Sequence, residues 1–374
     1  MNTSFGKLLE TDGFKKVFTT SIILGAAAGG VMNGHAINTL FTSAGLAALV
    51  TFMYLALGVA ALMQNVIVEK WRSRCLETLI GFSSCFLIYN VVLLLLWQLI
   101  SEAASMQARV QAIGVFCLDI LAALIVTAGY LHTKKIRCVP YTINLGLKGD
   151  PYRIVLLSDI HLGVFVGEEH IRKMVDQVNR LNADLVVICG DIVDVNNHIL
   201  EEDSALTKIS AILKTLYAKE GVFAVLGNHD PNIEHQKFKD FLMASNIQLL
   251  HNQVIHLSRL NLIGRTDSSN NHRCSLEALL DKIDWSKPAV VLDHNPDGIP
   301  EAVKWRMDLV LCGHTHKGQF FPVTYFTKLA NGRRYFYGHE IFGRTHAVIS
   351  AGAGFFQLPV RIGTSNEIVD IQLL

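Results

Sequence analysis

The feature that most constrains this chain is the scarcity of charged side chains in its first third. No Asp, Glu, Lys or Arg occurs between Lys16 and Glu69, and later uncharged runs continue this pattern. Over the whole chain 17% of residues are charged, against about 25% in a typical soluble globular protein. We therefore predict a multi-pass transmembrane region over residues 1–133. The remainder, 134–374, has mixed charge and is long enough to bury a core of its own.

The uncharged region divides into four apolar segments. The last three approach or exceed the ~20 residues that a helix needs to cross the hydrocarbon core. The first is shorter and rich in small residues, and two lysines precede it, so a cleaved signal segment is the alternative there. We expect an all-α bundle of about four transmembrane helices. The segments are Val17–Met32, Phe41–Met63, Leu79–Ile100 and Gln111–Leu131.

The placement of lysine and arginine predicts an orientation. Basic residues precede the first segment, separate the second from the third and follow the fourth, whereas the opposite connections hold only Arg109. By the positive-inside rule both termini lie in the cytoplasm. We expect a multi-pass inner-membrane protein whose C-terminal domain is cytoplasmic. The basic residues are Lys7, Lys15, Lys16, Lys70, Arg72, Arg74, Lys134, Lys135 and Arg137.

One carboxylate, Asp119, lies inside the fourth segment. An ionised carboxylate at the centre of a bilayer costs roughly 2.5–3.5 kcal/mol on insertion scales. We interpret it as a protonated or hydrogen-bonded packing residue. The alternative is a functional polar element, partnered by His35 or by a hydroxyl group of another segment.

Beyond Pro140, short apolar runs alternate with amphipathic segments. Such runs indicate strands that are covered on both faces, and hence α/β layering. From Arg333 to Leu374 the pattern is typical of short β hairpins. The predicted strands are YRIVLLS, DLVVICG, VFAVLG, LNLIG, AVVLDH and DLVLCG, and the predicted helices are Glu168–Leu181, Glu201–Tyr217 and Lys237–Ala244.

Nearly every predicted strand ends in side chains that bind metals. The carboxyl ends of the strands in an α/β sheet gather at one edge, and residues two apart in extended chain share a face. Imidazole, carboxylate and amide ligands suit Mn, Fe or Zn better than Mg or Ca. Two divalent ions held ~3.5–4 Å apart would leave net positive charge for a phosphate group. The residues are Asp159, His161, Asp191, Asn228, His229, His294, His314 and His316.

The motifs DxH, GDxxD, GNHD, a strand-end histidine and GHxH occur in that order. This ordered set resembles the calcineurin-like metallophosphoesterase superfamily, from Tyr152 to about Leu374. The resemblance implies a four-layer fold, a β-sandwich flanked by helices, over the domain at 134–374. It also implies hydrolysis of a phosphate ester or anhydride by a hydroxide that bridges two divalent metal ions.

The resemblance assigns roles to individual residues. It implies that His229 contacts the phosphate or the leaving group and that Asp194 orients His229. It places Asp159, His161, Asp191 and His316 on the first metal ion, and Asp191 (bridging), Asn228, His294 and His314 on the second.

The tail of the chain is similar to bacterial phosphohydrolases that carry a membrane anchor, among them the type that acts on UDP-2,3-diacylglucosamine. We therefore expect a phosphodiester or pyrophosphate substrate that is lipid-linked, with membrane lipid as a partner and no nucleic acid. A membrane-located nucleotide or cyclic-nucleotide phosphodiesterase is the alternative enzyme. A scaffold or sensor without turnover is the alternative from another class.

Three arginines are candidate substrate contacts. Arg265 follows a strand in LIGRTD and could reach a second phosphate. Arg333 and Arg334 adjoin the loop GQFFPVTYF, in which aromatic residues are frequent. We hypothesise that this loop forms a wall near the bilayer that receives a lipid or an elongated phosphodiester. Hairpin packing with solvated arginines is the alternative.

Overall fold

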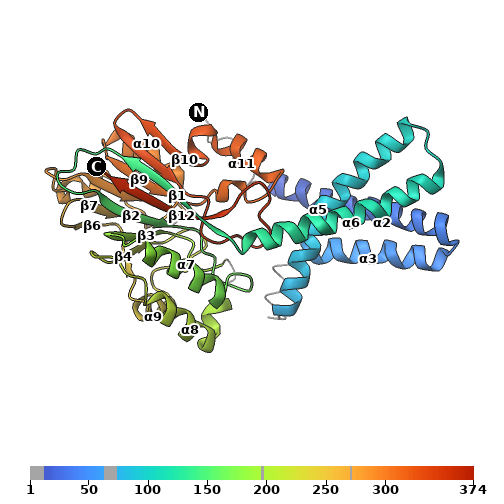
Figure 1. Cartoon of the computed structure of the whole chain (residues 1–374), viewed down its shortest axis with the longest axis horizontal. Helices are drawn as coiled ribbons and strands as arrows, with labels where there is room; N and C mark the ends of the chain where they lie inside the picture. The colour runs from blue at the N-terminus through green and yellow to red at the C-terminus, as the bar shows by residue number, and fades with distance from the viewer. Residues whose placement is uncertain (1–11, 63–73, 195–197, 270–271) are drawn as a thin grey trace. The chain divides into compact units, whose positions relative to one another are not determined.

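The computed structural model describes residues 12–62, 74–194, 198–269 and 272–374. Two compact units are present: one comprises the described residues up to His132 together with Gln357–Val360, and the other comprises Thr133–Phe356 and Arg361–Leu374. The first, the helical unit, contains α-helices, whereas the second, the α/β unit, contains two β-sheets with helices on their outer faces (Figure 1).

Three helices of the helical unit, α3, α5 and α6, are long and apolar enough to cross a membrane. The fourth, α2, is longer than the predicted segment Val17–Met32 but is not among these three. Lys7, Lys70 and Arg72, on which the predicted orientation partly depends, lie outside the described residues. The helices are α2 (Asp12–Phe41), α3 (Ala44–Leu62), α5 (Arg74–Ala103) and α6 (Ala108–Thr133).

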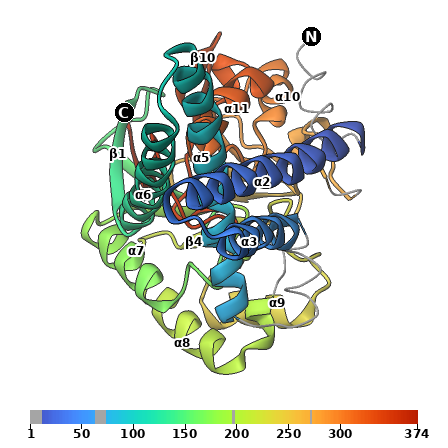
Figure 2. The same ribbon diagram turned by 90° about the vertical axis from the view of Figure 1, so that its right-hand side faces the viewer.

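Small residues explain how α2 packs on α3 (Figure 2). A Cβ atom on Gly30 would lie 3.0 Å from the carbonyl oxygen of Thr51, and one on Gly34 would lie 2.6 Å from the Thr51 hydroxyl. Helices in lipid associate through such close packing, because lipid tails are as apolar as the side chains and so provide no hydrophobic driving force. The glycines of α2 therefore have a packing role.

Four buried or partly buried polar side chains, one from each helix, meet inside the helical unit. Asp119 Oδ1 accepts hydrogen bonds from Asn90 Nδ2 at 2.6 Å and, at 3.4 Å, from both Asn33 Nδ2 and the Tyr54 hydroxyl. Asn33 Nδ2 also donates to the Tyr54 oxygen at 3.0 Å. We call these four residues the polar network. Asp119 has the hydrogen-bonded surroundings that its interpretation as a packing residue requires.

The α/β unit contains two six-stranded sheets. The first has the order β1-β12-β2-β3-β4-β5 and the second the order β10-β11-β9-β8-β7-β6. The first sheet consists of β1 (Ile136–Ile143), β2 (Tyr152–Leu157), β3 (Leu185–Cys189), β4 (Val222–Val225), β5 (Gln248–Leu249) and β12 (Asn366–Leu373). The second consists of β6 (Gln253–His256), β7 (Asn261–Gly264), β8 (Ala289–Leu292), β9 (Leu309–Cys312), β10 (Gly338–Phe342) and β11 (Thr345–Ile349).

Each sheet buries both of its faces, which is why the predicted strands are continuous apolar runs. In β2, Val155 and Leu157 pack in the core with the helices, whereas Ile154 and Leu156 pack in the core between the sheets. This division follows from the two-residue period of a strand. Helix, sheet, sheet and helix give the four layers that were predicted. The helical segments of this unit are α7 (Glu168–Arg180), η1 (His198–Glu201), α8 (Asp203–Leu213), α9 (Gln236–Ala244), η2 (Glu277–Lys282), η3 (Pro296–Gly298), α10 (Ile299–Lys304), η4 (His316–Gly318), α11 (Val323–Asn331) and η5 (Arg333–Tyr335).

The structure corrects three local predictions. The strand β1 was not anticipated, and it pairs in parallel with β12. The tail forms one antiparallel hairpin, β10–β11, but β12 is a long strand between β1 and β2 and belongs to no hairpin. The predicted loop GQFFPVTYF instead leads into helix α11. All three depend on contacts with segments distant in sequence, which local patterns do not encode.

Candidate metal centre

Parallel strands bring the predicted ligands to one edge of the α/β unit. Asp159 follows β2 and Asp191 follows β3, and these strands run in parallel. In the other sheet β8 and β9 are also parallel, with His294 after the first and His314 after the second. The order of the strands, rather than proximity in sequence, therefore assembles the site.

The backbone at these positions is unusual. Five of the seven predicted metal ligands have positive φ, a region that few residues other than glycine occupy. Such a conformation costs on the order of 1–3 kcal/mol per residue and persists where surrounding structure enforces it, often at functional sites. The five are Asp159 (49°), His161 (51°), Asp191 (53°), His314 (71°) and His316 (50°).

Glycines precede the ligands because the carboxylates occupy the space that a side chain would need. A Cβ atom on Gly227 would lie 2.1 Å from Asp191 Oδ1. A Cβ atom on Gly313 would lie 2.3 Å from Asp159 Oδ2. The glycines of the GNHD and GHxH motifs are thus steric requirements of the two aspartates.

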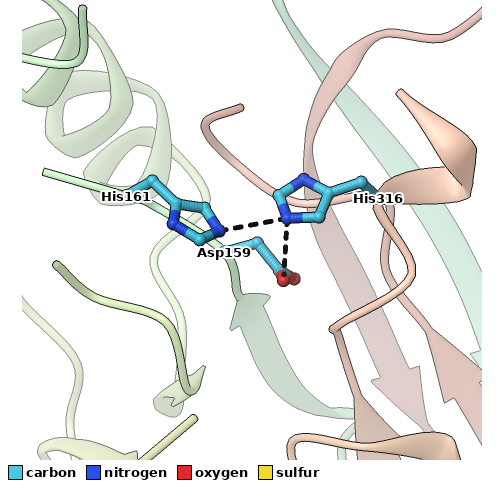
Figure 3. Close-up of side chains that lie close together, drawn as sticks. All are labelled: Asp159, His161 and His316. Atoms are coloured by element: carbon cyan, nitrogen blue, oxygen red, sulfur yellow. Dashed lines mark hydrogen bonds and ion pairs between the residues drawn. The ribbon is translucent and has the colours of Figure 1, made fainter. Parts of the chain in front are cut away.

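One group of side chains consists of Asp159, His161 and His316 (Figure 3). The Nε2 atoms of the two histidines lie 3.0 Å apart, and His316 Nε2 lies 3.4 Å from Asp159 Oδ1. All three offer ligand atoms within 4.8 Å of one another. The group has the composition of a metal site with nitrogen and oxygen ligands.

A second group adjoins the first and shares Asp159 with it. Asp159, Asp191 and His294 also offer ligand atoms within 4.8 Å of one another. Asp191 Oδ2 lies 3.2 Å from His294 Nε2 and 3.6 Å from His161 Nε2, so one carboxylate oxygen faces a histidine of each predicted ligand set. This is the position that a bridging carboxylate would need.

Asn228 joins the remaining predicted ligands to the second group. Its Oδ1 atom lies 3.1 Å from His294 Nε2 and 2.9 Å from His314 Nδ1. The structure therefore brings together all seven predicted ligands, which we call the histidine–carboxylate cluster: Asp159, His161, Asp191, Asn228, His294, His314 and His316.

The cluster fits divalent cations. Asp159 and Asp191 are buried, and the ion-pair partners that the described residues give them are all histidines. Buried carboxylates without a fixed positive partner are costly, and metal coordination is one of the ways in which proteins compensate them. His294 Nδ1 lies 2.7 Å from the carbonyl oxygen of Cys189, which fixes the ring with Nε2 toward the cluster, as is usual for metal-binding histidines.

Charges within the cluster also act on one another. Burial alone would raise the pKa of Asp191, but His294, His161 and His229 outweigh it and hold that pKa well below the usual range. Burial alone would lower the pKa of His294, but the charge of Asp191 and the hydrogen bond to it raise that pKa well above its ordinary value. The carboxylate of Asp191 and the imidazole of His294 thus favour each other's charged forms.

His229 lies beside the cluster. Its backbone N–H donates to Asp191 Oδ1 at 2.9 Å, and its ring stacks on Phe356 with the ring centres 4.7 Å apart. Asp194, predicted to orient His229, has its Oδ1 atom 3.5 Å from Nδ1 of His161. The structure therefore gives Asp194 an ion pair with a predicted metal ligand, and its action on His229 stays a prediction.

The predicted substrate arginines differ in their burial. Arg265 is fully buried, with Nη2 2.5 Å from Asp293 Oδ2 and Nη1 paired with Glu301. No surface is left for a substrate, so this prediction is wrong, because the strand end that carries Arg265 directs it into an internal ion-pair group. Arg333 and Arg334 are exposed, and Arg334 pairs with Glu340 at 3.3 Å.

Two supporting residues were not identified from the sequence. Asp230 accepts hydrogen bonds from the backbone N–H groups of Ile192 and Gly227, both at 2.8 Å, and so joins the loops after β3 and β4. Burial, with a contribution from Asp191, raises the pKa of Asp230 to about 7. Its place at the end of the GNHD motif was the signal available in the sequence.

Arg361 is the second. It is 1% exposed and donates to the carbonyl oxygens of His316, Ala351 and Gly354 at 2.6–2.8 Å. It therefore fixes the turn that carries His316. No signal in the sequence distinguished it from a surface arginine.

Residues 152–318 match the family model described as calcineurin-like phosphoesterase. An uncharacterized metallophosphoesterase of Helicobacter pylori (strain J99) is 33% identical over 253 residues, which are 65% of each chain. A Danio rerio protein named as a transmembrane protein with metallophosphoesterase domain is 30% identical over 337 residues, 79% of this chain and 73% of that one. This chain thus spans somewhat less than two thirds of the Helicobacter relative and nearly three quarters of the fish relative.

Proposed function

Because this chain belongs to the calcineurin-like phosphoesterase family, we propose that it is a membrane-bound, metal-dependent hydrolase of phosphate esters or anhydrides. The observation that carries the proposal is the position of Asp191, one oxygen of which faces a histidine of each predicted ligand set. The candidate membrane helices and the transmembrane name of the Danio rerio relative support the membrane location.

In this proposal the cluster holds two divalent ions, with Mn, Fe or Zn favoured by its ligands. When bound, the ions would supply Lewis acidity at the phosphate group and lower the pKa of water. One ion would be held by Asp159, His161, Asp191 and His316, and the other by Asp191, Asn228, His294 and His314.

The chain itself would orient the reacting groups. His229 is anchored through its backbone N–H to Asp191 and through its ring to Phe356, so its imidazole can contact a phosphate bound at the cluster. We assign it the stabilisation or protonation of the leaving oxygen. Asp194 would hold His161 in place and, as predicted, assist the orientation of His229.

The substrate that we favour is a lipid-linked phosphodiester or pyrophosphate. The support is the arrangement of the chain, in which only Lys134 and Lys135 separate α6 from the first strand of the α/β unit. The positions of the basic residues support cytoplasmic placement of that unit, and the candidate membrane helices support our proposal of multi-pass insertion in an inner membrane. A nucleotide or cyclic-nucleotide phosphodiesterase is the competing enzyme.

One set of assays tests the function. The full chain in detergent with Mn²⁺ is given bis-p-nitrophenyl phosphate, cyclic AMP and a lipid pyrophosphate in mixed micelles. The variants are Asp191→Ala and His229→Ala, and the control is Asp176→Ala, which changes an exposed aspartate of α7. We expect both site variants to lose turnover and the control to retain it.

Equal rates for the wild type and both site variants would refute the assigned site. Absence of turnover with every substrate and metal, while bound metal is retained, would favour a scaffold or sensor. Faster turnover of cyclic AMP than of the lipid pyrophosphate would support the alternative function, a nucleotide or cyclic-nucleotide phosphodiesterase.

A further inference from the structure

The helix α11 exposes an apolar face that a water-soluble domain would bury. Tyr325, Phe326 and Leu329 are 59%, 51% and 55% exposed, and Phe321, just before the helix, is 61% exposed. Ala330 of the same helix is buried. Four large apolar side chains within nine residues form a patch of the kind that marks a protein or membrane contact.

The stretch of sequence that contains α11 is rich in basic residues. Between His314 and His339 the chain has four basic residues and no Asp or Glu. Lys328 and Arg333 are exposed. Aromatic and leucine side chains beside exposed basic residues are typical of helices that lie in the membrane interface, where anionic headgroups attract lysine and arginine at about 1 kcal/mol each.

The beginning of α11 is close to the place where the last candidate membrane helix ends. The backbone N–H of Phe321 donates to the carbonyl oxygen of Ile362 at 3.0 Å. Asn366 Nδ2 donates to the carbonyl oxygen of Thr133, the last residue of α6, at 2.7 Å. Asn366 is four positions after Ile362 in the sequence, so the two residues are at most about 14 Å apart.

We propose that α11 and Phe321 form an interfacial helix that inserts Phe321, Tyr325, Phe326 and Leu329 into the same bilayer that holds α6, with Lys328 and Arg333 at anionic headgroups. Three observations support it: the exposed apolar face, the basic residues of this stretch and the link through Ile362 and Asn366 to Thr133. The occupant of this face is therefore lipid.

The helix is also packed against the turn that carries His316. A Cβ atom on Gly318 would lie 2.4 Å from the Cα atom of Thr324 in α11, so turn and helix are in direct contact. Lipid that holds α11 at the interface would therefore also place the cluster beside the headgroups. This consequence rests on the proposed function and indicates an amphiphilic substrate, whereas the insertion of α11 does not depend on turnover.

The insertion can be tested by fluorescence. The full chain carrying Phe326→Trp is reconstituted into nanodiscs that contain phosphatidylcholine brominated in the acyl chains and phosphatidylglycerol, and the emission of the parent protein is subtracted. The control is Met243→Trp, because Met243 is 75% exposed on α9, away from α11 in sequence and in the fold. We expect bromolipid to reduce the added emission of the α11 variant about twofold and to leave the control unchanged.

Equal emission of Phe326→Trp in brominated and ordinary lipid would overturn the proposal. If instead Phe326→Cys joins two copies of the chain by a disulfide bond at high yield in lipid, the face is a contact between copies, and the proposal is also wrong. The parent chain, with its own cysteines, is the reference for that measurement.

An activity measurement separates this proposal from the proposed function. We expect the double variant Phe326→Ser, Leu329→Ser to lose at least about fivefold in turnover of a bilayer phosphodiester and to retain its rate with bis-p-nitrophenyl phosphate. Met243→Ser is the control. An equal loss with both substrates would contradict a role in access from lipid. If the emission of Phe326→Trp is quenched but the protein has no hydrolytic activity, the insertion of α11 into the bilayer is supported and the proposed enzymatic function is refuted.

Discussion

Both units of this protein bury polar side chains, but they satisfy them differently. In the polar network of the helical unit, donors meet acceptors, and the Asp119 carboxylate accepts from an amide of each of two helices and a hydroxyl of a third. In the histidine–carboxylate cluster, imidazole nitrogens and carboxylate oxygens converge, as in the 3.0 Å approach of His161 Nε2 to His316 Nε2. The first arrangement is typical of packing, whereas the second has the composition of a metal site.

The largest effect that tests this contrast is expected from Gly227→Ala. The added methyl group would lie 2.1 Å from Asp191 Oδ1, so the carboxylate must move from its place between the two histidines. Because loss of supporting groups alone costs 10–100-fold in metal affinity or activity, we expect at least a 100-fold loss of Mn²⁺ affinity and turnover. Calorimetric titration measures the Mn²⁺ affinity, and an esterase assay measures the turnover.

The matched control is Gly167→Ala, because a Cβ atom at Gly167 would meet no atom within 4 Å. Unchanged metal affinity in Gly227→Ala, with the fold intact by circular dichroism, would mean that Asp191 does not hold the ions.

A smaller effect, on stability, is expected from Arg361→Met. The substitution leaves three buried oxygens, those of the Ala351 and Gly354 carbonyls and Asn366 Oδ1, without their donor, whereas the His316 carbonyl keeps the N–H of Gln319. At about 1 kcal/mol or more for each unsatisfied group, the α/β unit should lose roughly 3 kcal/mol of its free energy of unfolding. Thermal unfolding in detergent, with exposed Arg172→Met as control, checks this. A loss below that of the control would show that Arg361 does not stabilise the His316 turn.

Metal binding should stabilise one unit and not the other. At a free Mn²⁺ concentration of 100 times Kd, binding adds about 2.7 kcal/mol to the free energy of unfolding of the α/β unit. Chelation should therefore lower the unfolding temperature of that unit and leave that of the helical unit unchanged. Near-ultraviolet circular dichroism measures the first transition, and far-ultraviolet circular dichroism measures the second. Equal shifts of both transitions would contradict the expectation that metal ions bind only in the α/β unit.

The smallest effect is expected from Asp119→Asn. Asparagine keeps an oxygen acceptor for Asn90 and Tyr54, and hydrogen bonds between membrane helices contribute on average about 0.6 kcal/mol. We expect a destabilisation below about 1 kcal/mol in unfolding by sodium dodecyl sulfate and full turnover of soluble and lipid substrates. Intact stability with loss of the activity on lipid alone would show that the polar network has a functional role.

The sequence by itself determined the chemistry of the site and the layering of the fold. The convergence of the seven candidate ligands could be predicted because each motif lies at the end of an apolar run. Such a run, buried on both faces, indicates a strand even when its partner strands are not known. The apolar helices could be predicted for a similar reason, since the length of an uncharged run is a local property. His229 and Asp194 were named through the order of the motifs.

Only the tertiary structure decided how distant segments meet. Arg265 looked like a phosphate contact at a strand end but is enclosed by Asp293 and Glu301, and Arg361 looked like a surface arginine but holds the turn of His316. The register that places β12 between β1 and β2, and the exposed face of α11, likewise depend on segments far apart in the chain. A side chain's type sets what it can bind, but its burial and partners are set by the packing of the whole unit, which no local pattern contains.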